Sequence, residues 1–202
     1  MFVQVIQGRA KDLAALRRQW DTWDQQLKPT TTGFLGGTAG VTADGEFIAL
    51  VRFEDQAAAR ASSDRAEQND WWRETSQHLE EPMFHDCTLV DLVNDGGSDD
   101  AGFVQVIQGK VTDVDRAREI DRAMEEDMRR LRPDVIGGMV AWHPRDGRFT
   151  NAMYFTSEDE ARAKEHETSK SPAFEQYMSE YQTISDGDPE YLDITDPWYS
   201  SP

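Results

Sequence analysis

The heptapeptide Phe-Val-Gln-Val-Ile-Gln-Gly occurs twice in this chain of 202 residues, at positions 2–8 and again at 103–109. A shift of 101 residues extends the match as far as two glycine pairs, and a shift of 102 extends it beyond them. The extra residue falls where a hairpin turn is expected, and turns tolerate insertions. The chain is therefore predicted to be a duplication, with the heptapeptide as the first strand of each half.

Each half is predicted to run strand, helix, strand, strand, helix, strand. The first helix has apolar residues three and four positions apart, which predicts one face packed on a sheet. A hairpin follows, with an Asp-Gly pair at its turn, at 44–45 and at 146–147. The second of these turns is predicted to run from Pro144. Residues 83–93 and 191–194 are predicted as the closing strands. The stripe of the first helix comprises Leu13, Leu16, Trp20, Trp23 and Leu27.

Apolar residues on both faces of the first strand indicate that both faces of its sheet are covered, only one of them by helices. We therefore expect an α+β fold with two ferredoxin-like βαββαβ repeats in one chain, forming a pseudo-dimeric α+β barrel. The predicted boundaries are 1–93 for the first repeat, 94–102 for a linker, and 103–202 for the second repeat with a C-terminal tail. Separate, non-interacting halves are the alternative. A chain that closes its own barrel is expected to be a monomer or a weak dimer.

The charge of the chain excludes several partners. Thirty-nine acidic against 21 basic residues give a net charge of −18, which repels nucleic acid and anionic lipid. No apolar run is long enough to cross a bilayer, and the N-terminus shows no signal-peptide pattern. A single cysteine, Cys87, excludes an intramolecular disulfide and fits a reducing compartment. These features predict a cytoplasmic protein that binds neither nucleic acid nor membranes.

The segment from His166 through Ser171-Pro172-Ala173-Phe174 resembles a helix motif of the dimeric α+β barrel superfamily, and most closely that of antibiotic-biosynthesis monooxygenase-like domains. The strand pattern extends this resemblance over nearly the whole chain, which is similar to actinobacterial tandem proteins of unassigned activity. The superfamily includes cofactor-independent monooxygenases of polyketide-derived phenols, haem-degrading enzymes and lactone isomerases. The haem-degrading branch uses a first-strand Asn and a helical Trp–His pair, which this chain lacks in register, so no cofactor is expected.

Motifs for metal binding and nucleophilic catalysis are not found. No two of the four histidines have the spacing that zinc sites require, so no metal is expected. No serine or cysteine nucleophile stands beside a base in a recognised pattern, and no glycine-rich loop connects a strand to a helix.

Polar side chains within apolar strands are the best indication of a site, because a buried polar group without a partner is costly. Gln4 and Gln105 lie on one face of their strands, and Gln7 and Gln108 lie on the other. We favour the first pair as the one inside the barrel, although hydrogen bonds to a neighbouring strand would also explain it. The predicted ligand pocket comprises Gln4, Gln105, Arg52, Trp72, Asn151, His166, Phe174 and Tyr177.

Each of these residues also has a purely structural interpretation. Arg52 could form an ion pair at a strand end, His166 could be a solvated helix residue like its counterpart Asp64, and the aromatic rings could fill the core. The halves differ at Ala49/Asn151, Arg52/Tyr154 and Asp64/His166. These differences predict asymmetric binding, with the specialised pocket in the second half.

Two functions remain open from the sequence. One is a cofactor-independent monooxygenase or isomerase that acts on a small aromatic or polyketide-like molecule. The other is a non-catalytic barrel that binds a ligand or a protein, linked to stress or to a pathway enzyme.

Overall fold

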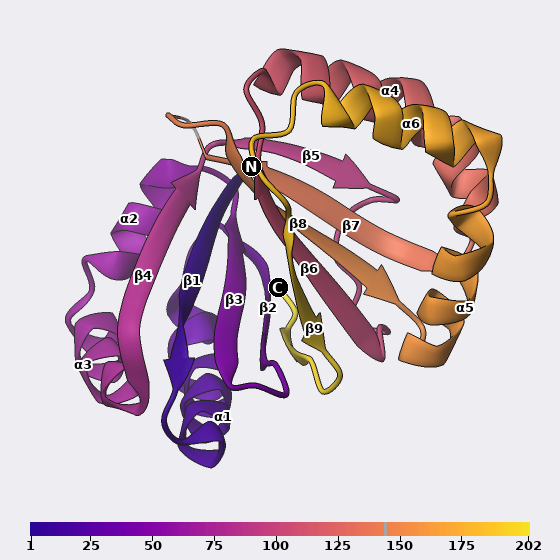
Figure 1. Ribbon diagram of the computed structural model, residues 1–202. Coiled ribbons are helices and arrows are strands. Elements are labelled where there is room, and N and C mark those ends of the chain that lie inside the picture. The colour runs from indigo at the N-terminus through magenta and orange to yellow at the C-terminus, as the bar shows by residue number, and fades with distance from the viewer. Residues whose placement is uncertain (144) are drawn as a thin grey trace. The chain divides into compact units, whose positions relative to one another are not determined.

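The computed structural model describes residues 1–143 and 145–202. Pro144, which the sequence places in the second hairpin turn, lies outside the described residues. The chain forms two compact units, Met1–Val90 with Asp196–Pro202, and Asp91–Thr195 (Figure 1). None of the helices in the described part of the chain has the length and hydropathy needed to span a bilayer.

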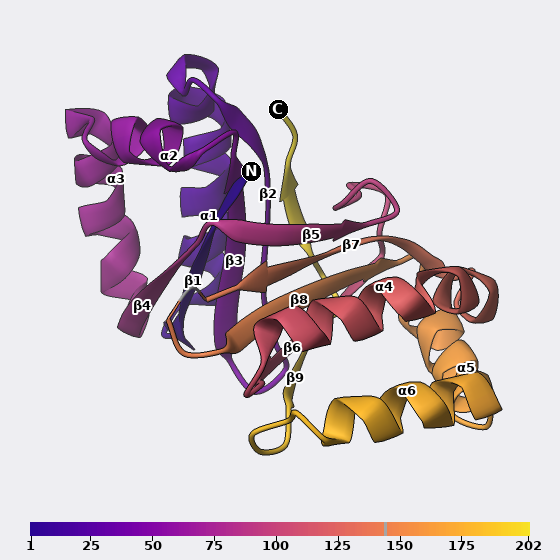
Figure 2. The ribbon, with the colours of Figure 1, turned by 90° about the horizontal axis from the view of Figure 1, so that it is seen from above.

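The first unit contains an antiparallel sheet with helices on one side of it (Figure 2). Its strands lie in the order β10-β2-β3-β1-β4, so the strand of the first heptapeptide is internal. The elements in chain order are β1 (Phe2–Ala10), α1 (Leu13–Thr22), η1 (Trp23–Leu27), η2 (Lys28–Thr30), β2 (Phe34–Val41), β3 (Glu46–Phe53), α2 (Gln56–Ser63), α3 (Ala66–Thr75), η3 (Ser76–His78), β4 (Leu79–Cys87) and β10 (Trp198–Ser200).

The second unit repeats this arrangement, with strand order β5-β7-β8-β6-β9. Gln4 pairs with Val51 and Gln105 pairs with Met153, so the two repeats share their register at equivalent positions. The prediction of two ferredoxin-like βαββαβ repeats is therefore confirmed. The elements are β5 (Leu89–Val93), β6 (Phe103–Lys110), α4 (Val114–Leu131), β7 (Val135–Trp142), β8 (Arg148–Phe155), α5 (Glu158–Thr168), α6 (Pro172–Gln182) and β9 (Glu190–Ile194).

The first helix of each repeat begins in the same way. The carboxylates of Asp12 and Asp113 each accept a hydrogen bond of 2.9 Å from the backbone N–H three residues later, which satisfies a donor that the first turn leaves open. In the first repeat the helix continues as the π-helical turn η1, which buries Trp23 and Leu27. Leu13, by contrast, is 55% exposed, so the predicted apolar stripe of this helix is wrong at its first residue.

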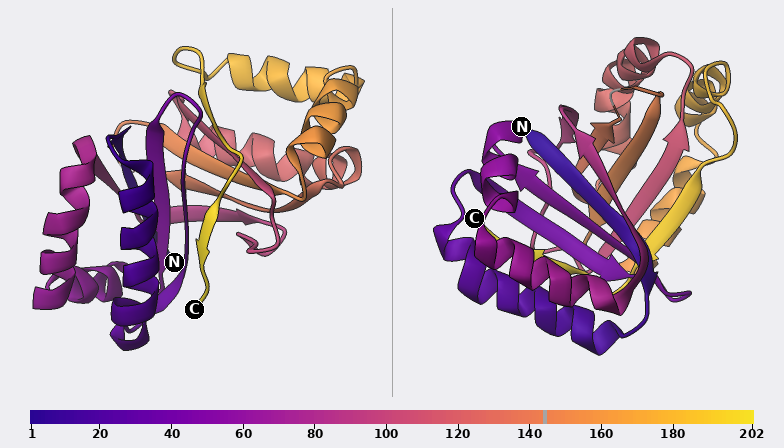
Figure 3. Two further views of the ribbon diagram at one scale, coloured as in Figure 1. Left: turned by 90° about the horizontal axis from the view of Figure 1, so that it is seen from below. Right: turned by 90° about the vertical axis from the view of Figure 1, so that its left-hand side faces the viewer.

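One predicted strand is wrong: residues 83–93 do not form a single closing strand. The strand is interrupted at Thr88. The part before it, β4, lies at the edge of the first sheet, and the part after it, β5, pairs with β7 in the second sheet. The predicted C-terminal tail likewise contains β10, which pairs with β2 of the first sheet (Figure 3). A physical reason lies in the open edges of β2 and β7, whose unpaired backbone groups each gain a partner from the segment that follows the other repeat.

The tail contributes a large side chain to the core of the first unit. Trp198 is 2% exposed and belongs to the same hydrophobic cluster as Leu16, Trp20 and Phe47. Its ring centroid lies 6.3 Å from that of Phe47, and the Arg17 guanidinium lies over its ring. The last residues of the chain therefore stabilise the first repeat.

Removing residues 196–202 is expected to destabilise the first unit selectively, by about 3–5 kcal/mol, the usual cost of deleting a buried tryptophan side chain. Hydrogen exchange should show faster exchange in β2 and β3 and unchanged exchange in β7 and β8. Removal of Pro202 alone is the control. Equal loss of protection in both units, or no loss in either, would contradict this assignment.

Candidate ligand-binding site

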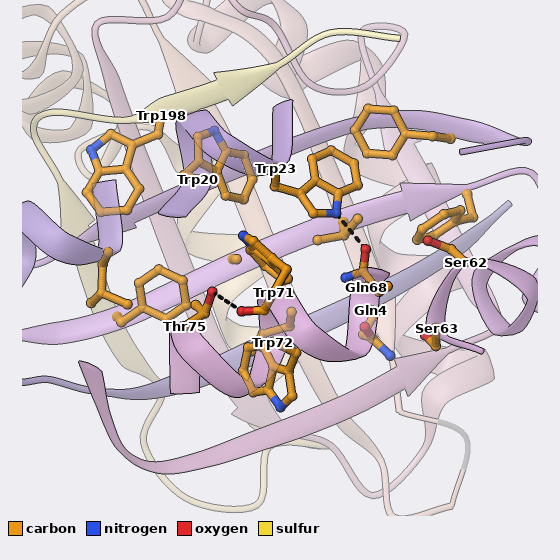
Figure 4. A pocket seen from close by; sticks show the side chains of 17 residues that line it. Gln4, Trp20, Trp23, Ser62, Ser63, Gln68, Trp71, Trp72, Thr75 and Trp198 are labelled. Carbon is orange, nitrogen blue, oxygen red and sulfur yellow. Dashed lines mark hydrogen bonds between the residues drawn. The ribbon is translucent and has the colours of Figure 1, made fainter. Parts of the chain in front are cut away.

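A cavity of about 60 Å³ lies within the first unit, between the sheet and the helices, and is partly open to solvent (Figure 4). The side chains of β1 alternate, so that Gln4 and Ile6 point to this helix-covered side while Val3 and Val5 are fully buried on the other side. The small side chain of Ala49 on β3 leaves space in this wall.

Tryptophan side chains form much of the wall. They come from α1, η1, α3 and β10, and are Trp20, Trp23, Trp71, Trp72 and Trp198. Three of them are held by hydrogen bonds from their indole N–H groups. Trp23 donates to the side-chain carbonyl of Gln68 at 2.8 Å, Trp71 to the backbone carbonyl of Gln19 at 2.8 Å, and Trp20 to that of Tyr199 at 3.3 Å.

Uncharged polar groups gather at one end of the cavity. Figure 4 shows Gln4, Gln68, Ser62 and Ser63 near one another, away from Trp20 and Trp198. The Gln4 amide donates to Asp86 Oδ1 at 3.0 Å, which leaves its carbonyl available, and Gln68 uses its carbonyl for Trp23. No other described residue hydrogen-bonds the amide nitrogen of Gln68 or the hydroxyl of Ser62. This end can therefore both donate to and accept from a ligand.

The cavity contains no ionisable group among the described residues that line it. It therefore offers neither a general acid nor a general base, and a buried charge on a ligand would have no counter-charge. Cys87 on β4 is fully buried, and burial raises the pKa of its thiol to about 12, so it is not a reactive thiolate. Among the described residues no three His, Cys, Asp or Glu side chains gather to hold a metal ion.

Gln4 and Trp72 are the two residues of the predicted pocket that line this cavity. Trp72 is half-buried, and its ring packs edge-on against Phe84 with centroids 4.8 Å apart. Arg52 pairs with Val3 and so lies on the opposite face of the sheet, where its Nε is buried without a hydrogen-bond partner among the described residues.

The other predicted residues lie in the second unit. Gln105 is 8% exposed and donates to Asp193 Oδ1 at 3.0 Å, as Gln4 does to Asp86, so both glutamines bond the neighbouring strand, which is the alternative left open by the sequence. The expectation that Gln4 points into the barrel is wrong, because its side chain lies on the helix-covered face of the sheet. Asn151 has a buried Oδ1 without a partner among the described residues. His166 is exposed, with its Nε2 2.8 Å from the Lys170 ammonium.

Phe174 and Tyr177 pack against each other on α6, with ring centroids 6.0 Å apart. The Tyr177 hydroxyl donates to Asp121 Oδ1 at 3.0 Å, and that of Tyr181 donates to Oδ2 at 3.4 Å. Burial raises the pKa of Asp121 to about 6, although these two hydrogen bonds oppose the shift. Burial and the neighbouring Asp121 raise the pKa of Tyr177 well above its ordinary value.

The repeats therefore use equivalent positions differently. Asp121 is the counterpart of Trp20 and Tyr177 is the counterpart of Thr75, and both Trp20 and Thr75 line the cavity of the first repeat. In the second repeat this position holds a polar network instead of an aromatic wall. The cavity described here lies in the first repeat, whereas the sequence differences favour a specialised pocket in the second.

Three features of the site escape sequence reasoning. Trp198 stands in a short tail without strand periodicity, and Gln68 and Ser62 look like ordinary polar helix residues. Asp121, by contrast, could have been found from the sequence. The repeat alignment places this acid at the position where the first half has a tryptophan of the apolar stripe. Such a replacement indicates a buried carboxyl.

No family model matches the chain, and no curated protein matches it in sequence. Solved structures match over its whole length. A candidate monooxygenase from Fusobacterium nucleatum has a TM-score of 0.75 at 14% identity, over 99% of this chain and 94% of its own. One from Lactobacillus acidophilus has a TM-score of 0.71 at 12% identity, over 98% of both chains. An anthrone oxidase-like protein has a TM-score of 0.67 at 8% identity, over 100% of this chain and 94% of its own.

At these identities the similarity shows the fold. The chain has the ferredoxin-like α+β fold of these structures, so the fold implied by the resemblance around Phe174 is confirmed.

The buried carboxyl of Asp121 predicts a distinct pH dependence of stability. Its folded pKa of about 6 is above the ordinary value of 3.8, so the folded state binds the proton more tightly and stability falls as the pH rises from about 4 through 6. The shift corresponds to about 3 kcal/mol. Asp121→Asn should remove this fall, as measured by urea unfolding at pH 4.5, 6 and 7.5.

Asp115→Asn is the control, because it removes an exposed carboxylate from the same helix and so matches the change in net charge. A fall in stability that is the same in the Asp121→Asn variant and in the wild type would show that Asp121 is not the group responsible.

Proposed function

We propose that the first repeat binds a small, uncharged aromatic molecule that carries a carbonyl or hydroxyl group. The observation that supports this most directly is the composition of the cavity, which combines tryptophan walls with an uncharged polar end. Flat apolar walls favour a ring, because aromatic side chains stack on aromatic ligands and contribute large contact areas. The amides of Gln4 and Gln68 with the Ser62 hydroxyl would orient the oxygen of the ligand.

The chemistry that fits such a site is cofactor-independent oxygenation or isomerisation of that molecule. Without an ionisable wall residue, the protein would not remove the proton from the ligand by a general base of its own. A phenol or enol would have to lose its proton to water at the partly open polar end, where the Gln68 amide and the Ser62 hydroxyl could donate to the oxygen of the resulting anion while the cavity positions its ring. Two of the similar structures are candidate monooxygenases and a third is anthrone oxidase-like, which agrees with this proposal.

Non-catalytic binding of the same ligand class is the second candidate. It is favoured by the same lack of an acid or base in the wall. Oxygen consumption separates the two: the protein with anthrone, in air and without added cofactor, should consume oxygen above the rate of a buffer blank if it is an oxygenase. Binding of anthrone without faster oxygen uptake or a changed product would leave the non-catalytic function.

The two equivalent glutamines provide a matched test of binding. Gln4→Leu removes an amide from the cavity, whereas Gln105→Leu makes the same change outside it. We expect Gln4→Leu to weaken binding of 2-naphthol about 2- to 10-fold, the usual value of one net hydrogen bond. Gln105→Leu should leave the affinity unchanged, as measured by calorimetry.

The melting temperature of both variants controls for effects on folding. Equal affinities of the two variants would show that the Gln4 amide does not contact the ligand. Absence of any binding by the wild type to phenol, 2-naphthol or anthrone would contradict the proposed function itself.

A further inference from the structure

One wall of the cavity comes from the far end of the chain. Trp198 on β10 lines the cavity together with Trp20 and Phe47, although more than 150 positions separate it from each of them in sequence. Figure 4 shows its indole beside that of Trp20, at the end of the cavity opposite Gln4. The first repeat therefore has a complete cavity only when β10 is in place.

The attachment of β10 is short. Its three residues pair with β2 alone, and it forms the edge of the sheet. Beyond this pairing, side-chain hydrogen bonds connect it and the residue after it to the segment from α1 to η2. Trp20 donates to the Tyr199 carbonyl at 3.3 Å, Lys28 donates to the Ser201 carbonyl at 3.0 Å, and Ser200 donates to Asp24.

The size of the cavity requires part of its wall to move before a ring can enter. Its volume of about 60 Å³ is well below the roughly 150 Å³ of a dry cavity that binds benzene. The other strands that line it, β1, β2 and β3, each pair with a strand on both sides. Short strands at a sheet edge open at a lower free-energy cost than internal strands, and β10 is such a strand.

In the second repeat, the strand added at the equivalent edge of the sheet is held differently. There β5 takes the place of β10 beside β7, and its Asp91 accepts two hydrogen bonds of 2.7 Å from Arg118. Arg118 is the counterpart of Arg17, which in the first repeat lies over the Trp198 ring with its guanidinium carbon 5.3 Å from the centroid. A bidentate ion pair therefore joins β5 to the first helix of its repeat, whereas the equivalent arginine contacts β10 through the face of a ring.

We propose that β10 is the movable wall of the first-repeat cavity and that Trp198 sets the largest ring that the cavity accepts. This inference rests on the proposed function, because it concerns entry of the aromatic ligand. Displacement of β10 carries the Trp198 indole away from Trp20 and opens the apolar end, while the amides at the other end stay on β1 and α3.

A disulfide between β10 and β2 tests the movement. Tyr199 lies opposite Thr38, and directly paired strand residues have the separation that a disulfide requires. Along β10 the side chain of Tyr199 alternates with those of Trp198 and Ser200, so the bridge lies on the face away from the cavity. The double variant Thr38→Cys/Tyr199→Cys is compared in its oxidised and reduced forms. Cys87 is too deeply buried to compete for the bridge.

The oxidised form is expected to lose binding of 2-naphthol, whereas the reduced form should bind it as the wild type does. Equal binding rates and affinities of the oxidised and reduced forms, while both bind, would overturn the movable wall.

A substitution tests the size limit independently. Trp198→Ala should strengthen binding of three-ring anthrone relative to one-ring phenol at least about tenfold, the discrimination that a single group gives in an apolar pocket. Trp142→Ala is the matched control, because Trp142 is an equally buried tryptophan in the second unit. Trp198→Phe should lie between the wild type and the alanine variant.

The outcomes separate this inference from the proposed function. If the wild type binds a probe and Trp198→Ala leaves the ring-size preference unchanged, Trp198 does not set the limit, although the ligand site stands. If neither the wild type nor Trp198→Ala binds any of the three probes, both proposals are wrong.

Discussion

The open edge of each four-stranded repeat is the constraint on which the rest of the structure depends. In a βαββαβ repeat the second strand lies at an edge of the sheet. Its unpaired backbone groups are costly to bury and can pair with the wrong partner. Here β10 pairs with β2, and β5 pairs with β7, so each repeat is completed by a segment that follows the other one along the chain. The two repeats are thereby linked through backbone hydrogen bonds as well as by the connector. A truncated first repeat would lack a strand of its own sheet and a wall of its own cavity.

Duplication then allowed the two helix–sheet interfaces to differ in chemistry. The backbone register is the same in both, and the glutamines of the repeated heptapeptide make the same hydrogen bond to an aspartate of the neighbouring strand. What differs is the helix side. Trp20 packs beside a cavity, whereas its counterpart Asp121 binds two tyrosine hydroxyls. The tryptophan packs beside the cavity, whereas the carboxyl of Asp121 is surrounded by its hydrogen-bond donors. The second interface therefore contains a titratable group at the position where the first has a cavity.

The sequence predicted the architecture well because duplication repeats every local signal. Two copies of the strand, of the capping aspartate and of the Asp-Gly turn agree with one another, and agreement between signals is what makes a prediction strong. Prediction failed for β5 and β10, because strand exchange is decided by non-local pairing and not by the local pattern around Thr88 or Trp198. Of the predicted pocket residues, Gln4 and Trp72 line the cavity of the first repeat, although Gln4 does so on the helix-covered face and not inside the barrel. Trp198 was not predicted, because its part of the wall comes from the tail by non-local pairing.

The absence of charged side chains from the lining of the cavity also limits how it can select a ligand. Groups that act by charge must be offset when buried, and this chain, with a net charge of −18, places its carboxylates elsewhere. Selectivity in such a site comes from shape and from a few uncharged hydrogen-bond partners, which discriminate weakly by size and strongly by the position of a single oxygen. The indoles of Trp23 and Trp71, which are held by groups outside β10, supply the shape, and Gln4 and Gln68 supply the partners. Because β1 and α3 carry the polar groups, the proposed movement of β10 would change the apolar end of the cavity and leave the polar end in place.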